Sequence, residues 1–215
     1  MPASGALLWI DTDANGTLRT MRDVVGIVLA AGESRRMGSP KALLLWRGHT
    51  FLEHVNGSLM TADVADIRVV VGPWGTGRQA NSAHYILLEN PHPEGGPISS
   101  IRIALTSKET KARFAVVSQV DHPAVRPETV RALVDLARSR PGEVVIPMYE
   151  GRGGHPVAIP SELFPVILDP KTASLRDAIA SYPADRVHRW PCGDPGVLVN
   201  VDTPEDLDRL VGSGA

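Results

Sequence analysis

Cysteine is nearly absent from this 215-residue chain, in which Cys192 is the only one. A single thiol excludes an intrachain disulfide framework and every zinc site that needs two or more thiolates. We therefore expect a protein of the reducing cytoplasm. Long apolar runs are also missing, since none approaches the ~20 residues that span a bilayer. The short apolar patch Gly5–Ile10 has no basic residue before it, so we expect neither a secretion signal nor a membrane segment.

Charge of one sign is not in excess either, because 22 Lys and Arg face 24 Asp and Glu, which leaves a net charge of −2. No strong overall field attracts nucleic acid or an anionic membrane, so any anion site must be built locally. Hydrophobic residues make up 43% of the chain, and 20 glycines and 18 prolines indicate many loops. The composition is that of a globular protein with a sizeable core.

Short apolar runs alternate with amphipathic segments along most of the chain. Runs typical of strands occur at 24–29, 67–71, 84–88, 114–118, 144–148, 157–159 and 197–201. Helical spacing occurs at 51–60, 98–105, 127–138, 173–180 and 204–211. This alternation predicts a three-layer α/β fold with a mostly parallel central sheet. We expect one domain over residues 23–215, preceded by an extension, residues 1–22, that is either disordered or weakly paired at a sheet edge.

The segment that follows the first predicted strand carries the clearest chemical signal. It lies at the carboxyl edge of a parallel sheet, where ligands bind. Small residues at 30–32 let phosphates approach the backbone, and the candidate nucleotide-binding residues here are Leu29, Ala30, Ala31, Gly32 and Arg36. Arg35 and Lys41 add further positive charge, which favours a polyphosphate site. It is not a P-loop, because no Lys-Ser/Thr pair follows Gly38. The alternative is an ordinary surface turn with solvated charges.

A second candidate segment places Gly95 and Gly96 directly before Pro97, with Ser99 at the predicted start of a helix. Backbone amides at such a start can face a nucleobase or a phosphate. A capped helix after a tight turn explains the same residues equally well.

Two aspartates, Asp121 and Asp202, each follow a predicted strand. Carboxylates at one sheet edge can share a divalent metal, and Mg²⁺ typically takes one or two of them and completes its shell with water and phosphate oxygens. Each could instead cap the next helix, Asp202 especially, because Pro204 and Glu205 follow it. Together with the phosphate loop, the pair favours the metal.

His155 lies in the glycine-rich turn before the strand at 157–159, where it either binds a substrate anion or stabilises the turn. The seven histidines do not show metal-site spacing, which makes a transition-metal site improbable. The stretch 75–80 matches the dinucleotide pattern G-x-G-x-x-A loosely. We expect a surface loop there, because Pro73 and Trp74 separate it from the preceding strand.

Several of these segments together resemble the MobA-like nucleotidyltransferases. The segments that carry the resemblance are 29–41, 95–101, 120–123, 154–157 and 194–207, and it covers nearly all of residues 24–212. Within the family the chain is most similar to the molybdenum cofactor cytidylyltransferases. Its Leu-Ala-Ala-Gly opening resembles theirs, whereas the guanylyl branch usually reads Leu-Ala-Gly-Gly. The resemblance implies a Rossmann-like nucleotidyltransferase fold.

The activity that the resemblance implies is an attack by the terminal phosphate of molybdenum-molybdopterin on the α-phosphate of CTP, which transfers CMP and releases pyrophosphate. The product would serve xanthine-dehydrogenase-type enzymes. By resemblance Arg35 and Lys41 contact the triphosphate, and the segment Gly95–Ser99 faces the base. Asp121 and Asp202 would hold Mg²⁺. Catalysis would then rest on Arg35, Lys41 and Asp121.

The acceptor side is represented by His155 and Arg176, the candidate substrate-binding residues. The chain departs from the family at His122, where relatives often carry Gln or Met, and at 174–176, where Ser-Leu-Arg replaces the common Gly-Ala-Arg. Two alternatives are a nucleotidyltransferase that uses GTP or another phosphorylated acceptor, and a non-catalytic chaperone that delivers the cofactor to a molybdoenzyme client.

Overall fold

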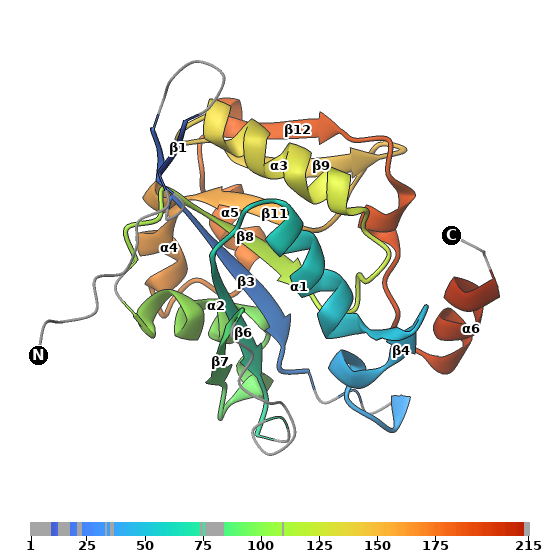
Figure 1. The fold of residues 1–215 in the computed structure, drawn as a ribbon. Coiled ribbons are helices and arrows are strands. Elements are labelled where there is room, and N and C mark those ends of the chain that lie inside the picture. The colour runs from blue at the N-terminus through green and yellow to red at the C-terminus, as the bar shows by residue number, and fades with distance from the viewer. Residues whose placement is uncertain are drawn as a thin grey trace, which may run out of the picture.

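The computed structural model describes residues 10–12, 18–20, 23–32, 34, 37–73, 75, 84–108 and 110–212. Its centre is an eight-stranded mixed sheet with helices on both faces (Figure 1). The strands follow the spatial order β10-β9-β11-β8-β3-β6-β7, and β12 pairs with β9. Strands β3, β6, β7 and β8 are mutually parallel, and β12 runs parallel to β9, whereas β11 is antiparallel to β8 and β9. The predicted α/β class is confirmed.

Six strands of the central sheet lie within about two residues of predicted runs, whereas those at Arg152–Gly153 and Val187–Pro191 were not predicted. The central sheet contains β3 (Val24–Ala30), β6 (Asp66–Val71), β7 (Ile86–Glu89), β8 (Phe114–Gln119), β9 (Val144–Tyr149), β10 (Arg152–Gly153), β11 (Val157–Pro160) and β12 (Val187–Pro191). Two small separate sheets pair β1 (Ile10–Thr12) with β2 (Leu18–Thr20) and β4 (Leu45–Trp46) with β5 (His49–Thr50). The described strands of the N-terminal extension therefore pair with each other and not with the central sheet.

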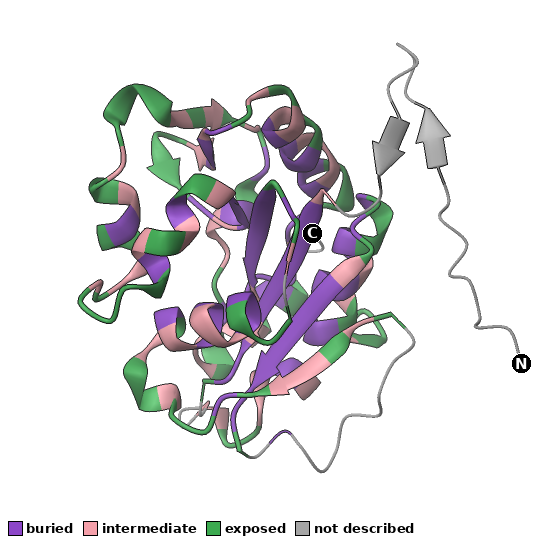
Figure 2. Ribbon diagram, turned by 90° about the vertical axis from the view of Figure 1, so that its left-hand side faces the viewer, coloured by how far each residue is buried: buried purple, intermediate pink, exposed green. Residues whose placement is uncertain are grey.

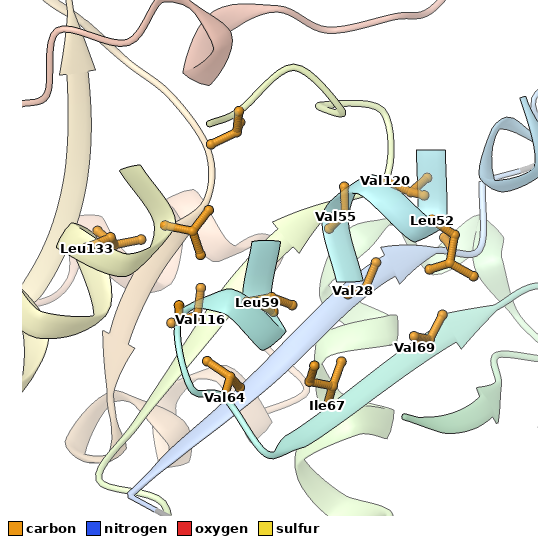
Figure 3. Packing of buried hydrophobic residues seen from close by; sticks show 14 of the residues in the cluster. Val28, Leu52, Val55, Leu59, Val64, Ile67, Val69, Val116, Val120 and Leu133 are labelled. Carbon is orange, nitrogen blue, oxygen red and sulfur yellow. The ribbon is translucent and has the colours of Figure 1, made fainter. Parts of the chain in front are cut away.

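Helices cover the two faces of the sheet and bury two apolar cores. The helices are α1 (Phe51–Thr61), α2 (Pro97–Thr106), α3 (Pro127–Ser139), α4 (Phe164–Leu168), α5 (Leu175–Ala180) and α6 (Pro204–Gly212). Val28 of β3 packs with α1 and α3 (Figure 3). Its neighbour Ile27 packs with α2 and α4 on the opposite face. Because neighbouring strand residues point to opposite faces, a strand buried on both sides needs an unbroken apolar run. Figure 2 shows this burial along the central strands.

The prediction of a strand over 197–201 is wrong. The 3₁₀ helix η6 (Pro195–Leu198) begins there instead, because Asp194 accepts a hydrogen bond from the backbone N–H of Gly196 and Pro195 suits a first helical position. The backbone N–H of Val201 donates to the carbonyl of Asp121 at 3.0 Å, which brings the end of this segment to the end of β8 without a strand.

Helix α5 begins at Leu175, two residues later than the predicted 173–180. Ser174 ends the preceding extended segment, since its hydroxyl accepts a hydrogen bond from the backbone N–H of Asp177 at 3.1 Å. Among the described residues no helix combines the length and the apolar character needed to cross a membrane.

Candidate active site

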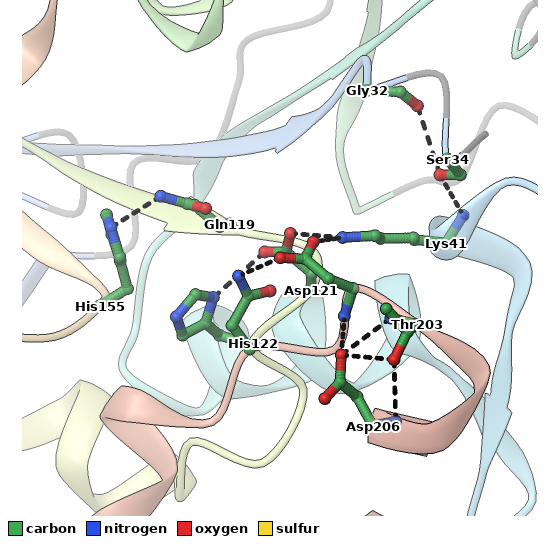
Figure 4. Close-up of polar contacts among 11 residues, drawn as sticks. Gly32, Ser34, Lys41, Gln119, Asp121, His122, His155, Thr203 and Asp206 are labelled. Atoms are coloured by element: carbon green, nitrogen blue, oxygen red, sulfur yellow. Dashed lines mark hydrogen bonds and ion pairs between the residues drawn. The ribbon is translucent and has the colours of Figure 1, made fainter. Parts of the chain in front are cut away.

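Lys41 lies between Asp121 and Asp202 at the carboxyl ends of β3 and β8. Its ammonium donates to Oδ2 of Asp121 at 2.9 Å and also to Oδ1 of Asp202 (Figure 4). Lys41 opens the 3₁₀ helix η2 (Lys41–Leu43), and its backbone N–H donates to the hydroxyl of Ser34 at 3.0 Å. The loop after β3 is thus hydrogen-bonded to the lysine at its end. The structure brings three predicted site residues together, namely Lys41, Asp121 and Asp202.

Asp202 reaches this place by a route that differs from the prediction, because no strand precedes it. Asn200 donates its side-chain N–H to Oδ2 of Asp202 at 2.9 Å and helps to orient the carboxylate. Helix α6 is capped by other groups, since Oδ2 of Asp206 accepts from the backbone N–H groups of Asp202 and Thr203. The side chain of Asp202 is therefore not used as a helix cap and stays on Lys41.

The charge state of Asp121 is set by its surroundings. Burial by itself raises the pKa of Asp121, but the hydrogen bond with Nδ1 of His122 and the ammonium of Lys41 together lower that pKa to about 2. Asp121 is therefore ionised throughout the neutral range.

A divalent cation fits this set of donors. Lys41 stands where a cation would stand, in contact with one oxygen of each of two carboxylates. Among the described residues no group of three or more His, Cys, Asp and Glu gathers into a metal site. Two hard oxygen donors from the protein, completed by water and phosphate oxygens, are typical of Mg²⁺.

A cavity of about 530 Å³ opens in front of these residues. It is lined by Leu29, Ala30, Gly32, Ser34, Lys41, Pro93, Glu94, Val120, Asp121 and Asp202. Ala31 is buried and is not part of this lining. A Cβ atom at Gly32 would meet no atom within 4 Å, so the space in front of that backbone is open to a ligand. The predicted residues Arg35 and Arg36 lie outside the described residues.

The predicted base-facing residues form a tight turn at the start of α2. Gly96 has φ +75°, a conformation that favours glycine, and the hydroxyl of Ser99 donates to its carbonyl at 2.7 Å. Asn90, which our sequence reading did not single out, donates to the hydroxyls of Ser99 and Ser100 at 2.8 and 2.9 Å. Gly95 belongs to the short helix η3 (Pro93–Gly95), whose other two residues line the 530 Å³ cavity. The turn therefore borders the cavity, while the hydroxyl of Ser99 is used in a hydrogen bond within the turn.

A second, larger cavity of about 970 Å³ lies on the other side of Leu29. Its walls come from β9, β11, β12, α2 and α5, and they include His155, Gln119, Arg176 and Arg189. No Asp or Glu appears among the described residues that line it. The guanidinium groups of Arg176 and Arg189 have no hydrogen-bond or ion-pair partner in the described part of the chain. Its walls are mostly apolar, and no described residue neutralises the charge of these two arginines.

His155 lines this cavity from a turn that packs closely against the backbone of Val197. Its Nε2 lies 2.7 Å from the side-chain nitrogen of Gln119, and its backbone N–H donates to the carbonyl of Val197 at 2.9 Å. A Cβ atom at Gly154 would lie 2.3 Å from that same carbonyl oxygen, so only glycine fits. Burial, together with the neighbouring His122, lowers the pKa of His155 to about 4. His155 is thus neutral at pH 7, and its Nδ1 is buried without a hydrogen-bond partner among the described residues.

Asp194 is a buried carboxylate. The sequence analysis included it only in the segment 194–207 that resembles the family, and gave it no role. Asp194 accepts hydrogen bonds from the backbone N–H of Arg126 at 3.0 Å and from the hydroxyl of Thr129 at 2.7 Å, in addition to Gly196. A Cβ atom at Gly196 would lie 2.2 Å from the carbonyl oxygen of Ala124. These contacts join the loop after β8 to the segment that carries Asp202. The Asp-Pro-Gly turn was the signal that could have identified this residue.

Comparisons with known proteins found relatives both in sequence and in fold. Three curated relatives cover nearly the whole chain. The nicotine blue oxidoreductase of Paenarthrobacter nicotinovorans is 30% identical over 200 residues, which are 87% of this chain and 96% of that protein. A probable molybdenum cofactor guanylyltransferase of Mycobacterium avium is 32% identical over 87% of this chain and 94% of its own. The molybdenum cofactor cytidylyltransferase of Escherichia coli is 26% identical over 84% and 92%.

The fold is also found in solved structures. The crystal structure of Rv0371c from Mycobacterium tuberculosis superposes with a TM-score of 0.72 at 24% identity, over 88% of this chain and 98% of that one. Residues 26–187 match the model of the MobA-like NTP transferase domain. That match spans well over half of the chain. The chain belongs to the MobA-like NTP transferase domain family.

Proposed function

We propose that this protein transfers CMP from CTP to the terminal phosphate of molybdenum-molybdopterin and releases pyrophosphate. The observation that carries the proposal is the contact of Lys41 with both Asp121 and Asp202 at the mouth of the 530 Å³ cavity. A lysine and two carboxylates beside an open backbone loop provide what a magnesium triphosphate needs, namely positive charge and hard oxygen donors. Family membership supports the same reaction class.

The reaction would form a bond between an acceptor phosphate oxygen and the α-phosphorus of CTP and break the bond from that phosphorus to pyrophosphate. Catalysis is then mainly positioning and charge neutralisation. The backbone at 29–32, with Arg35 and Arg36, would hold the triphosphate. Lys41 would contact its negatively charged phosphates. Asp121 and Asp202 would hold Mg²⁺, which when bound offsets the charge that develops on the leaving pyrophosphate.

The 970 Å³ cavity supports an anionic acceptor with a large ring system. Its mostly apolar walls suit a tricyclic body, while Arg176 and Arg189 supply two guanidinium groups that have no partner among the described residues. A phosphate is the group that arginine binds best in two-point geometry. His155, with its Nε2 held by Gln119, would form part of the wall against the pterin.

The choice of CTP rests on the Leu-Ala-Ala-Gly opening of the phosphate loop. Because relatives named as guanylyl- and cytidylyltransferases are both similar to this chain, the base is the part of the proposal that most needs a test. The test is pyrophosphate release from CTP, GTP, ATP and UTP with Mg²⁺ and a molybdopterin source. We expect turnover with CTP to exceed turnover with GTP by several orders of magnitude, since a site built for one base leaves polar groups unpaired with the other.

Each other outcome of this screen identifies an alternative. Faster turnover with GTP would replace the cytidylyl assignment by a guanylyl one. Release that does not depend on molybdopterin but requires another phosphorylated acceptor would change the acceptor. Binding of molybdopterin without turnover of any nucleotide would favour a chaperone that delivers the cofactor to a molybdoenzyme client.

A further inference from the structure

His122 follows Asp121 at the end of β8 and is buried, with 8% of its surface exposed. Its Nδ1 lies 3.1 Å from Oδ1 of Asp121, while Oδ2 of the same carboxylate accepts from Lys41 at 2.9 Å. The carboxylate is thus held from both sides, by an imidazole in the protein interior and by an ammonium at the cavity mouth (Figure 4). Removal of the imidazole would leave one oxygen of Asp121 free to turn.

On its other side, His122 packs against His155, which lines the second cavity. Its ring stands edge-on to the ring of His155, with centroids 5.1 Å apart and an interplanar angle of 63°. His155 in turn contacts Gln119, and both line the 970 Å³ cavity, whereas Asp121 lines the 530 Å³ cavity. One unbroken set of side-chain contacts therefore runs from the carboxylate to the wall of the proposed acceptor cavity.

We infer that His122 is a positioning residue that fixes the Asp121 carboxylate for a divalent cation and couples it, through His155, to the acceptor cavity. The inference rests on the proposed function. Partners of metal-binding groups orient those groups, and their loss typically costs about 10–100-fold in metal affinity.

Two substitutions separate the donor of His122 from its ring. His122→Asn keeps an N–H near the place of Nδ1 but removes the ring, whereas His122→Phe keeps the ring but removes the donor. Affinity for Mn²⁺ is measured from the electron paramagnetic resonance signal of free Mn²⁺, with the protein alone and with CTP, without acceptor. We expect His122→Phe to weaken Mn²⁺ binding on the order of tenfold and His122→Asn to stay much closer to the wild type. Equal affinity in wild type and His122→Phe would overturn the positioning role.

The coupling is tested by a double-mutant cycle with His155→Ala and the same Mn²⁺ readout. We expect His155→Ala to change Mn²⁺ affinity in the wild-type background and to have little effect when His122→Asn has already removed the ring, because contacting residues are non-additive. The same change in both backgrounds would overturn the link. This cycle does not depend on whether His122→Phe folds.

Matched measurements distinguish the possible failures. His49→Asn, an exposed histidine in β5, serves as the control and should leave Mn²⁺ affinity unchanged. Thermal melting of every variant identifies a loss of fold. Wild-type protein that binds no Mn²⁺, alone or with CTP, would overturn the metal site of the proposed function and this inference with it. Normal Mn²⁺ binding that is indifferent to His122 would overturn the inference alone.

Discussion

The ammonium of Lys41 lies 2.9 Å from Oδ2 of Asp121, although 80 positions separate the two residues in the sequence. The side chain of Lys41 is only 13% exposed, and it neutralises a carboxylate pair. From the sequence alone this lysine would be an exposed loop residue whose removal leaves stability unchanged. Its burial between carboxylates changes that expectation.

Lys41→Met should therefore lower both activity and stability. Without the ammonium, Asp121 and Asp202 repel each other, so we expect a loss of about 1–3 kcal/mol in the free energy of unfolding. Because a divalent cation can replace the lost charge, Mg²⁺ should raise the melting temperature of the variant more than that of the wild type. Thermal melts with and without Mg²⁺ measure both effects. An unchanged melting temperature together with normal kcat/KM would contradict the arrangement.

Gly154 and Gly196 lie very close to backbone carbonyls beside the site, so substituting them should cost far more stability than substituting a glycine in open space. Gly154→Ala and Gly196→Ala would each place a Cβ atom within 2.3 Å of a carbonyl oxygen, so we expect the backbone to shift. The cost should be at least about 2–3 kcal/mol in each case. Gly57→Ala is the matched control, since a Cβ atom there meets nothing within 4 Å in helix α1 and should stabilise by about 0.5–1 kcal/mol. Urea unfolding ranks the three variants.

A buried cation away from the site also makes a stability prediction. Arg68 of β6 is fully buried, pairs with Asp66, and donates to the carbonyl of Ala104 at 2.6 Å near the end of α2. Arg68→Ala would leave the carbonyl and the carboxylate without this donor, so we expect a loss of about 3–5 kcal/mol. Arg152→Ala, at an exposed position of β10, should stay within about 0.5 kcal/mol. Similar unfolding midpoints for the two variants would show that the buried contacts of Arg68 are not needed.

His155 predicts a pH dependence of stability. Its pKa is lowered to about 4 in the folded state, chiefly by burial, from 6.5. A group with a lowered pKa adds stability above its unfolded pKa and loses it as the pH falls through the folded value, so the loss should occur between about pH 6.5 and 4. We expect up to about 2–3 kcal/mol from this residue. His155→Gln should flatten the pH dependence in this window, as measured by urea unfolding, and an unchanged slope would exclude the effect.

Local patterns predicted the parts of the fold that depend on neighbouring residues. The unbroken apolar run of β3 predicted a strand buried on both faces, because such a strand needs apolar residues at every position. The helical spacing of apolar residues in α1 predicted a helix buried on one face. The segment after Asp194 has similar composition and was wrongly predicted as a strand. Its side-chain cap and the hydrogen bond from Val201 to Asp121 decide its course, and the second of these is a long-range contact.

The candidate site shows the same limit. Asp121 and Asp202 were predicted to meet at the ends of two strands, and the structure brings them together through a different path. Their role in binding a metal stays a prediction. The contribution of His122 was not visible in advance, since its partner His155 is distant in the sequence and a histidine beside an aspartate has no characteristic spacing. Arg35 and Arg36 lie outside the described residues, so their roles stay predictions as well.

The most direct test of the account is molybdopterin-dependent pyrophosphate release from CTP by Asp121→Asn, Asp202→Asn and the double variant, over a range of Mg²⁺ concentrations. Because both carboxylates would act through one ion, each single variant should lower kcat on the order of 100-fold, and the double variant should be little worse than the poorer single one. Near-normal kcat and Mg²⁺ dependence in either single variant would contradict the shared metal site and the mechanism built on it.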